Sequence, residues 1–263
     1  MRRISLPLWM VSVLLYIFLY APIVVVIVYS FNASRYGGPW RGFTTEWYPS
    51  LFDNADKLAA AKNTFILAFV STGIATLLGT MLGFGLSRYR FPGKKVFSFL
   101  MYIPVVIPDI VMAVAMLMFY ALVREQLGMT TMVLSHVTFQ IPFVAIVVRS
   151  RLVGMDPAIE EAAHDLGASS WQTFWHVTFP MIVPAVVAGG MLAFTLSLDD
   201  FVVSFFTTGP GSTTLPILIY SSVKRGITPD INALSTLIVL VSILGTVAVM
   251  LLQRPRRTSG ESS

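Results

Sequence analysis

Three carboxylates interrupt long apolar stretches of the sequence: Asp109, and the adjacent pair Asp199 and Asp200. An ionised side chain in hydrocarbon costs at least about 2.5–3.5 kcal/mol, so such residues usually face a cavity and mark a route for ions or substrates. Acidic side chains along such a route select cations. The sequence therefore predicts a wet route for a positively charged solute.

Structural alternatives exist for all three acids. Asp199 and Asp200 would then simply end a membrane helix among lipid headgroups. Asp109 would pair with a basic residue of another subunit, because no basic residue of this chain lies in a predicted span at that depth. The residue types alone leave both alternatives open.

Aromatic residues accompany an acid in the segment 32–62, which we expect to form an interfacial helix or lid outside the membrane. Trp47 and Tyr48 directly follow Glu46. Their ring faces would add cation–π contacts to a cationic solute. Aromatic side chains also form belts at the lipid interface, and this alternative is equally consistent with the sequence.

A second acidic feature lies in the segment 151–180. No Lys or Arg occurs between Arg151 and Lys224, and the segment carries four acids: Asp156, Glu160, Glu161 and Asp165. An acidic surface beside the anionic inner leaflet is electrostatically unfavourable, so a protein partner would explain it. An amphipathic connector lying on the membrane is the alternative.

Local signals predict a helix, a glycine elbow and a second helix in this segment. Asp156 before Pro157 is a typical helix start, and Gly167 a typical stop. Ser169 and Gln172 are spaced as a capping box. The expected apolar face is Ala158, Ile159, Ala162, Ala163 and Leu166, the expected polar face is Glu160, Glu161, His164 and Asp165, and the second helix carries the apolar stripe Trp171, Phe174 and Trp175.

The composition requires a membrane protein. The 263 residues are 56% hydrophobic and 12% charged, about half the charge of a soluble domain. The net charge of +5 comes from residues at the ends of apolar segments, which excludes a nucleic-acid patch. There is no cysteine, and the three histidines lack metal-ligand spacing, so no metal site is expected.

Six apolar stretches within one transmembrane domain, 1–263, predict an all-α fold. The expected spans are 8–31, 63–87, 96–122, 131–150, 180–203 and 231–252, with a cytoplasmic loop at 152–179. Eleven of the 18 Lys and Arg residues lie on the side of the two termini, so both termini are expected in the cytoplasm.

This orientation places the acids along their helices. At about 1.5 Å per residue, Asp109 lies about 20 Å from the cytoplasmic start of its span, and Asp199 about 28 Å from Pro180. Both are therefore expected in the outer half of the membrane. Pro104 and Pro108 should kink or break the third span, as happens around transport sites.

The cytoplasmic loop resembles the EAA loop of ABC-importer permeases. The matching pattern is Glu161-Ala162-Ala163, three residues, Gly167, nine residues, then Val177, any residue, Phe179 and Pro180. The resemblance implies a coupling helix that docks on a separate ATPase subunit. It implies contact through Glu161, with Ala162 and Ala163 in the motif, Gly167 as the elbow, and Glu160 and Asp165 as weaker candidates.

Nearly the whole chain is similar to the second permease subunit of spermidine/putrescine importers. The stretches that carry the similarity are 29–35, 42–48, 108–113, 135–139, 161–168, 194–200 and 231–233. The similarity implies that Trp47, Asp109, Ser197, Asp199 and Asp200 line the substrate path. The segment 209–216 looks more like the putrescine-only subfamily, so the choice of polyamine stays open.

The resemblance also implies an architecture, a location and partners. The chain would be a type I ABC importer permease in the bacterial inner membrane, in contact with the lipid bilayer. A homologous permease subunit, two ATP-binding subunits and a periplasmic substrate-binding protein would complete the importer. The chain lacks a phosphate-binding GxxxxGK[ST] loop, so ATP and magnesium would bind the partner ATPase, and this subunit would carry no cofactor and no catalysis.

Three functional alternatives stay open on sequence alone. A permease for a metal ion or another small solute would share the EAA loop. A secondary transporter would use the buried acids for ion coupling without an ATPase, and a membrane anchor or receptor would not transport. Gly79 and Gly83 form a GxxxG motif that predicts close helix packing, within the chain or against a partner subunit.

Overall fold

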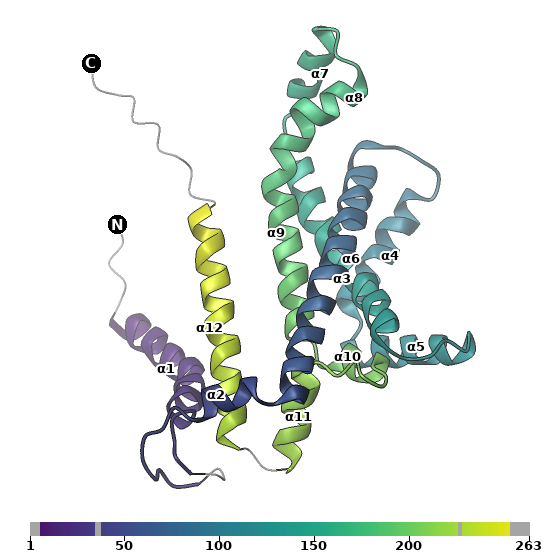
Figure 1. Cartoon of the computed structure of the whole chain (residues 1–263). Helices are drawn as coiled ribbons and strands as arrows, with labels where there is room; N and C mark the ends of the chain where they lie inside the picture. Colours follow the sequence, from purple (N-terminus) through teal and green to yellow (C-terminus); the bar gives the residue numbers. More distant parts are fainter. Residues whose placement is uncertain (1–5, 35–37, 226–227, 253–263) are drawn as a thin grey trace. The chain divides into compact units, whose positions relative to one another are not determined.

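The computed structural model describes residues 6–34, 38–225 and 228–252, and it is helical throughout apart from connecting segments and one isolated bridge between Asn32 and Phe43 (Figure 1). In chain order the helices are α1 (Leu6–Tyr29), α2 (Trp47–Phe52), α3 (Ala55–Arg88), α4 (Lys94–Val106), α5 (Asp109–Leu122), α6 (Met129–Val153), α7 (Ala158–Asp165), α8 (Ser170–Thr173), the π-helix η1 (Phe174–Thr178), α9 (Phe179–Leu198), α10 (Val202–Thr207), α11 (Leu215–Arg225) and α12 (Pro229–Leu252). The terminal arginines that support the expected orientation lie outside the described residues.

The chain divides into two compact units. The first comprises residues 1–58 and 219–263, and the second comprises residues 59–218. In the first unit α12 packs against α1 and α2. In the second unit α6 packs along α9, and α10 packs against α5 and α6. Within the second unit, α7 and α8 lie at one end of α9 and α10 lies at the other (Figure 1).

Four helical segments of the described chain are long and apolar enough to cross a bilayer. They are α1, α3, α6 and the continuous run Ser170–Leu198, which comprises α8, η1 and α9. A further crossing is possible through α4 and α5 taken together. The apolar part of α12 among the described residues, Pro229–Leu244, is shorter. A mostly helical membrane fold is therefore confirmed, and the count of six spans stays a prediction.

The third expected span, 96–122, is broken into α4 and α5, which are bent by 109°. α4 contains Pro104 and ends at Val106, so this proline does not break the helix. Ile107 instead adopts an extended conformation with ψ of 135°. Its extended backbone follows from Pro108, since the ring of a proline disfavours the helical conformation of the residue before it. The predicted break therefore occurs at Pro108.

At two other places the helices differ in extent from the expected spans. The span predicted at 63–87 begins at Ala55, because helix-forming residues continue the helix beyond its apolar part. The span predicted at 180–203 ends at Leu198. At its other end this span begins at Ser170, so the expected second loop helix is the first part of the long helix.

The glycines of the GxxxG motif pack within the chain. A Cβ on Gly79 would lie 2.6 Å from the Cβ of Val144, and a Cβ on Gly83 would lie 2.7 Å from the carbonyl oxygen of Ala145. Both neighbours belong to α6. The motif thus brings the backbones of α3 and α6 into close contact, which is the intrachain alternative.

Candidate functional site

Two of the three membrane acids lie at the junction between α9 and α10. Asp199 follows the last residue of α9, and Asp200 precedes α10. The carboxylate of Asp200 accepts hydrogen bonds from the backbone N–H groups of Val203 at 3.2 Å and Ser204 at 2.7 Å. These groups are unpaired donors at a helix start, so Asp200 caps α10.

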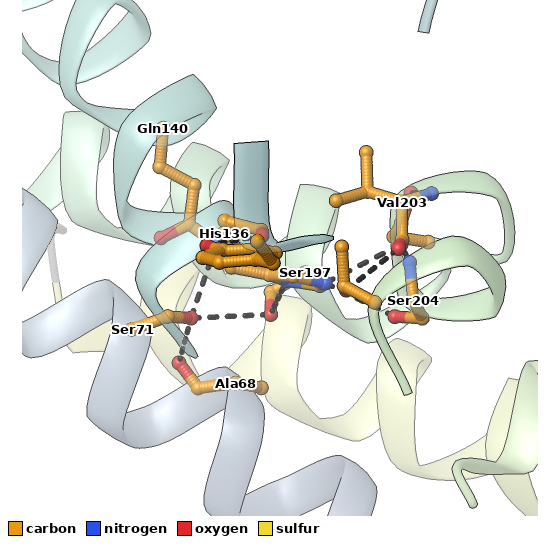
Figure 2. Close-up of polar contacts among 11 residues, drawn as sticks. Ala68, Ser71, His136, Gln140, Ser197, Val203 and Ser204 are labelled. Atoms are coloured by element: carbon orange, nitrogen blue, oxygen red, sulfur yellow. Dashed lines mark hydrogen bonds and ion pairs between the residues drawn. The ribbon is translucent and has the colours of Figure 1, made fainter. Parts of the chain in front are cut away.

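A fully buried histidine contacts the same junction from α6. His136 places Nδ1 2.8 Å from the hydroxyl of Ser197 and Nε2 3.0 Å from the hydroxyl of Ser204 (Figure 2). The same Nε2 lies 3.3 Å from a carboxylate oxygen of Asp200. The ring therefore joins the last turn of α9 to the first turn of α10.

The contacts continue to α3. The hydroxyls of Ser71 and Ser197 lie 3.3 Å apart, and Gln140 donates through Nε2 to Ser71 at 3.2 Å (Figure 2). We call this group the His136 cluster, and its members are Ser71, His136, Gln140, Ser197, Asp200 and Ser204. Buried polar networks of this kind hold the elements that carry them in one arrangement. The cluster therefore fixes the junction against α3 and α6.

Sequence reasoning missed His136, because the histidines were considered only as metal ligands. The signal was its position inside the expected span 131–150, where an ionisable residue is as unusual as an aspartate. Ser71 and Gln140 are uncharged polar residues, which are common in membrane helices. No sequence pattern indicates that Ser71 contacts Gln140 and Ser197, which lie 69 and 126 positions further along the chain.

Asp109 and Asp199 differ from Asp200. Both residues are exposed, and among the described residues neither side chain is hydrogen-bonded or ion-paired to another residue. The side chain of Asp200 is 10% exposed and is bonded within the chain. Asp109 is the first residue of α5, directly after the break, where the helix dipole favours a negative charge. Two of the three predicted acids thus lie on the surface of the described chain.

Trp47, the other predicted path residue, belongs to the first unit. Its indole N–H donates to the backbone carbonyl of Asn32 at 2.8 Å. The neighbouring Tyr48 hydroxyl lies 2.7 Å from the hydroxyl of Ser30. The polar ends of both aromatic side chains are therefore bonded within the chain and fix the segment between α1 and α3.

The predicted caps of the loop after α6 are confirmed. Asp156 accepts from the backbone N–H of Ala158 at 3.0 Å. Gly167 has φ of +87°, and its backbone N–H donates to the carbonyl oxygen of His164. The backbone N–H of Ala168 donates to the carbonyl oxygen of Ala163. These two bonds form a Schellman motif, which ends α7. The predicted capping box of Ser169 and Gln172 is also present, at the start of α8.

The expected faces of α7 need correction. Leu166, placed on the apolar face, is 89% exposed within this chain, as an apolar residue that meets lipid or a partner would be. Glu160, placed on the polar face, accepts from Nη2 of Arg88 at 2.9 Å and from the hydroxyl of Thr178 at 2.8 Å. Glu160 turns inward because a basic residue at the end of α3 meets it there. Glu161, Ala162 and Asp165 are exposed, and Ala163 is half-buried.

The fold and these features agree with the comparisons to known proteins. The chain belongs to the family of binding-protein-dependent transport system inner membrane components, which it matches over residues 75–255. It is 45% identical over 242 residues to the spermidine/putrescine transport system permease protein PotC of Escherichia coli strain K12, covering 92% of each chain. It is 41% identical over 259 residues to the putrescine transport system permease protein PotI of the same strain, covering 95% of this chain and 92% of that protein.

Solved structures show the same fold. A bacterial ABC transporter involved in the import of the acidic polysaccharide alginate gives a TM-score of 0.72 at 19% identity, covering 93% of each chain. The MetNI methionine ABC transporter gives a TM-score of 0.61 at 21% identity, covering 73% of this chain and 91% of that one. The chain is therefore an inner-membrane permease subunit with an ABC-transporter permease fold.

Proposed function

We propose that this chain is the membrane-spanning permease subunit of an ATP-driven importer of spermidine, putrescine or both. The observation that supports a polyamine as the substrate is the exposure of Asp109 and Asp199. Asp109 follows the break between α4 and α5, and Asp199 follows the end of α9. The names of the relatives PotC and PotI support the same substrate class.

The chemistry of a polyamine fits these acids. A flexible polycation carries ammonium groups several ångströms apart, and two separated carboxylates would bind two of them. An exposed carboxylate that pairs with no basic residue of the described chain would be free to bind an ammonium group of the solute. An anionic solute such as sulfate would be repelled. We therefore assign solute contact to Asp109 and Asp199.

Ser197 and Asp200 take a different role in this proposal. Both bond to His136 at the end of α9. They would hold the α9–α10 junction, and with it Asp199, in a fixed position. Trp47 would place its ring beside the route or at the lipid interface while its indole N–H holds Asn32.

The rest of the importer follows the family. The chain would cross the inner membrane six times with both termini in the cytoplasm, and a homologous permease subunit would supply the other half of the pore. Two ATPase subunits would bind ATP and magnesium, and a periplasmic protein would deliver the solute. The loop would dock on an ATPase through Glu161, Ala162, Ala163, Asp165 and the elbow Gly167, all of which are exposed except the half-buried Ala163.

The test is uptake of radiolabelled spermidine and putrescine into proteoliposomes that contain the full complex. Asp109→Asn and Asp199→Asn should each lower uptake about tenfold or more, as expected for loss of one bond to a charged group. Asp53→Asn, an exposed aspartate after α2, is the matched control and should leave uptake unchanged.

Two results would contradict the proposal. Competition by sulfate or a divalent metal ion, but not by polyamines, would assign another solute. Uptake that persists without the ATPase subunits would instead indicate a secondary transporter.

A further inference from the structure

Glu160 lies in the loop that faces the cytoplasm in the proposed topology, yet its carboxylate is bonded to two residues of the long helical segments. One oxygen, Oε1, accepts from Nη2 of Arg88 at 2.9 Å and from Oγ1 of Thr178 at 2.8 Å. Arg88 is the last residue of α3, and Thr178 is the last residue of η1. We call these three residues the Glu160 junction. It joins α7 to the ends of two long helices.

The junction is partly shielded from water. The side chains of Arg88 and Glu160 are each 21% exposed, and Thr178 is 2% exposed. Aromatic contacts join the same elements, since the rings of Phe84 in α3 and Phe174 in η1 lie 5.0 Å apart. A charged contact in such surroundings is less screened than one on an open surface, so the junction holds α7 more firmly than a surface ion pair would.

Two glycines flank α7, which packs against α8 and η1. Gly154 ends α6 before it, and Gly167 follows it with φ of +87°. Glycine backbones rotate easily, so part of a displacement of α7 can be absorbed at Gly154, whereas the bonds of Gly167 and Ala168 keep the end of α7 in place. The Glu160 junction gives movement of α7 a direct side-chain connection to α3 and to the end of η1.

The residue of the long helix that bonds to Glu160, Thr178, belongs to the π-helix η1. It occupies Phe174–Thr178, between α8 and α9. A π-helical turn has poorer hydrogen-bond geometry than an α-helix and often marks a position that changes conformation. Glu160 therefore bonds to the long helix at its least regular segment.

We propose that Glu160 is a positioning residue of the transport cycle, which carries the displacement of α7 to α3 and α9 rather than contacting the ATPase. The proposal rests on the proposed function, in which the ATPase moves α7. The adjacent Glu161 is exposed. The two glutamates thus have different roles: Glu161 contacts the ATPase subunit, and Glu160 transmits the resulting displacement of α7 to α3 and α9.

The first experiment separates docking from transmission in the full complex. Glu160→Gln, Arg88→Gln and Thr178→Val should each keep the ATPase subunits bound and hydrolysing ATP. Uptake per ATP hydrolysed should fall about tenfold for the first two, within the usual range for coupling between sites, and less for the third. The paired reversal Glu160→Arg with Arg88→Glu should recover part of that ratio.

The control is Arg90→Gln, an exposed arginine two residues beyond α3. It should leave the ratio unchanged. Loss of the ATPase subunits from Glu160→Gln, as expected for Glu161→Gln, would overturn the proposal. An unchanged ratio in Glu160→Gln and Arg88→Gln would overturn it as well.

The second experiment does not depend on the solute. The chain has no cysteine, so spin labels can be placed at Ala158→Cys in α7 and Arg90→Cys beyond α3. With Glu160 intact, the distance between the labels should stay the same when the complex binds ATP. With Glu160→Gln it should shift or broaden by roughly 2 Å or more, the scale of helix shifts in switching proteins.

The outcomes are distinguishable. A label distance that changes on ATP binding with Glu160 intact, or is unaffected by Glu160→Gln, rules out transmission through Glu160. Absence of polyamine uptake by the unaltered complex counts against the proposed function, and the label distances then still decide the role of Glu160.

Discussion

Asp199 and Asp200 are adjacent in sequence, yet their environments predict opposite consequences of removing each carboxylate. Asp199 is exposed, and among the described residues its side chain is not hydrogen-bonded or ion-paired to any other residue. Asp200 accepts two backbone N–H groups of α10 and lies 3.3 Å from Nε2 of His136. We therefore expect Asp200→Ala to lower stability, and Asp199→Ala to lower uptake without affecting stability.

The magnitude follows from the contacts. Loss of a helix cap costs about 0.5–2 kcal/mol. Loss of a charge-assisted bond to a buried group costs about 1.5–3 kcal/mol. Asp200→Ala should therefore destabilise the protein by about 2–5 kcal/mol, whereas an exposed side chain without contacts contributes within about 0.5 kcal/mol. Asp200→Asn keeps an acceptor for the cap but removes the charge, so it should fall between the two.

The assay is thermal unfolding of the purified complex in detergent, together with polyamine uptake at matched amounts of protein. Asp200→Ala should melt several degrees below the parent, and Asp199→Ala at the temperature of the parent with uptake strongly reduced. Equal melting temperatures for Asp199→Ala and Asp200→Ala would refute the reasoning, because the cap and the histidine contact would then contribute nothing.

Three further changes test other parts of the structure. Gly83→Ala should lower the melting temperature, because the new Cβ would lie 2.7 Å from the carbonyl oxygen of Ala145, whereas Gly85→Ala in the same helix meets nothing within 4 Å and should be neutral. Gly167→Ala should cost about 1–2 kcal/mol at φ of +87° and weaken coupling of ATP hydrolysis to uptake, with the melting temperature and the uptake-to-ATP ratio as readouts. Trp47→Phe removes a hydrogen bond but keeps an aromatic ring, so normal uptake with a lower melting temperature would assign Trp47 a structural role.

Local sequence rules predicted the features of the loop that depend on neighbouring residues. The turn at Gly167 and the capping box of Ser169 with Gln172 need only residues within five positions of each other. The break before Asp109 was equally local, because it depends on Pro108 and the residue before it. Each of these was predicted from residue type and spacing alone.

Features that depend on distant residues were missed or wrong. Glu160 was placed on the outer face of α7 because helical periodicity cannot show that Arg88, 72 positions earlier, lies beside it. The pairing of His136 with Ser197 spans 61 positions in the same way. Hydropathy placed the end of the fifth span beyond Asp200, since the apolar residues of α10 continue the signal after the helix has ended.

The 109° bend between α4 and α5 has a consequence for how the chain survives outside its complex. A helix interrupted at membrane depth leaves peptide groups that hydrocarbon cannot hydrogen-bond, and each unpaired group costs several kcal/mol unless water or protein meets it. The residues on both sides of the bend are uncovered within this chain, since Val106, Pro108 and Asp109 are exposed. A single copy of this chain in a bilayer would therefore be destabilised by the unpaired peptide groups at this bend. We expect cells that make the chain without its partner subunits to degrade it.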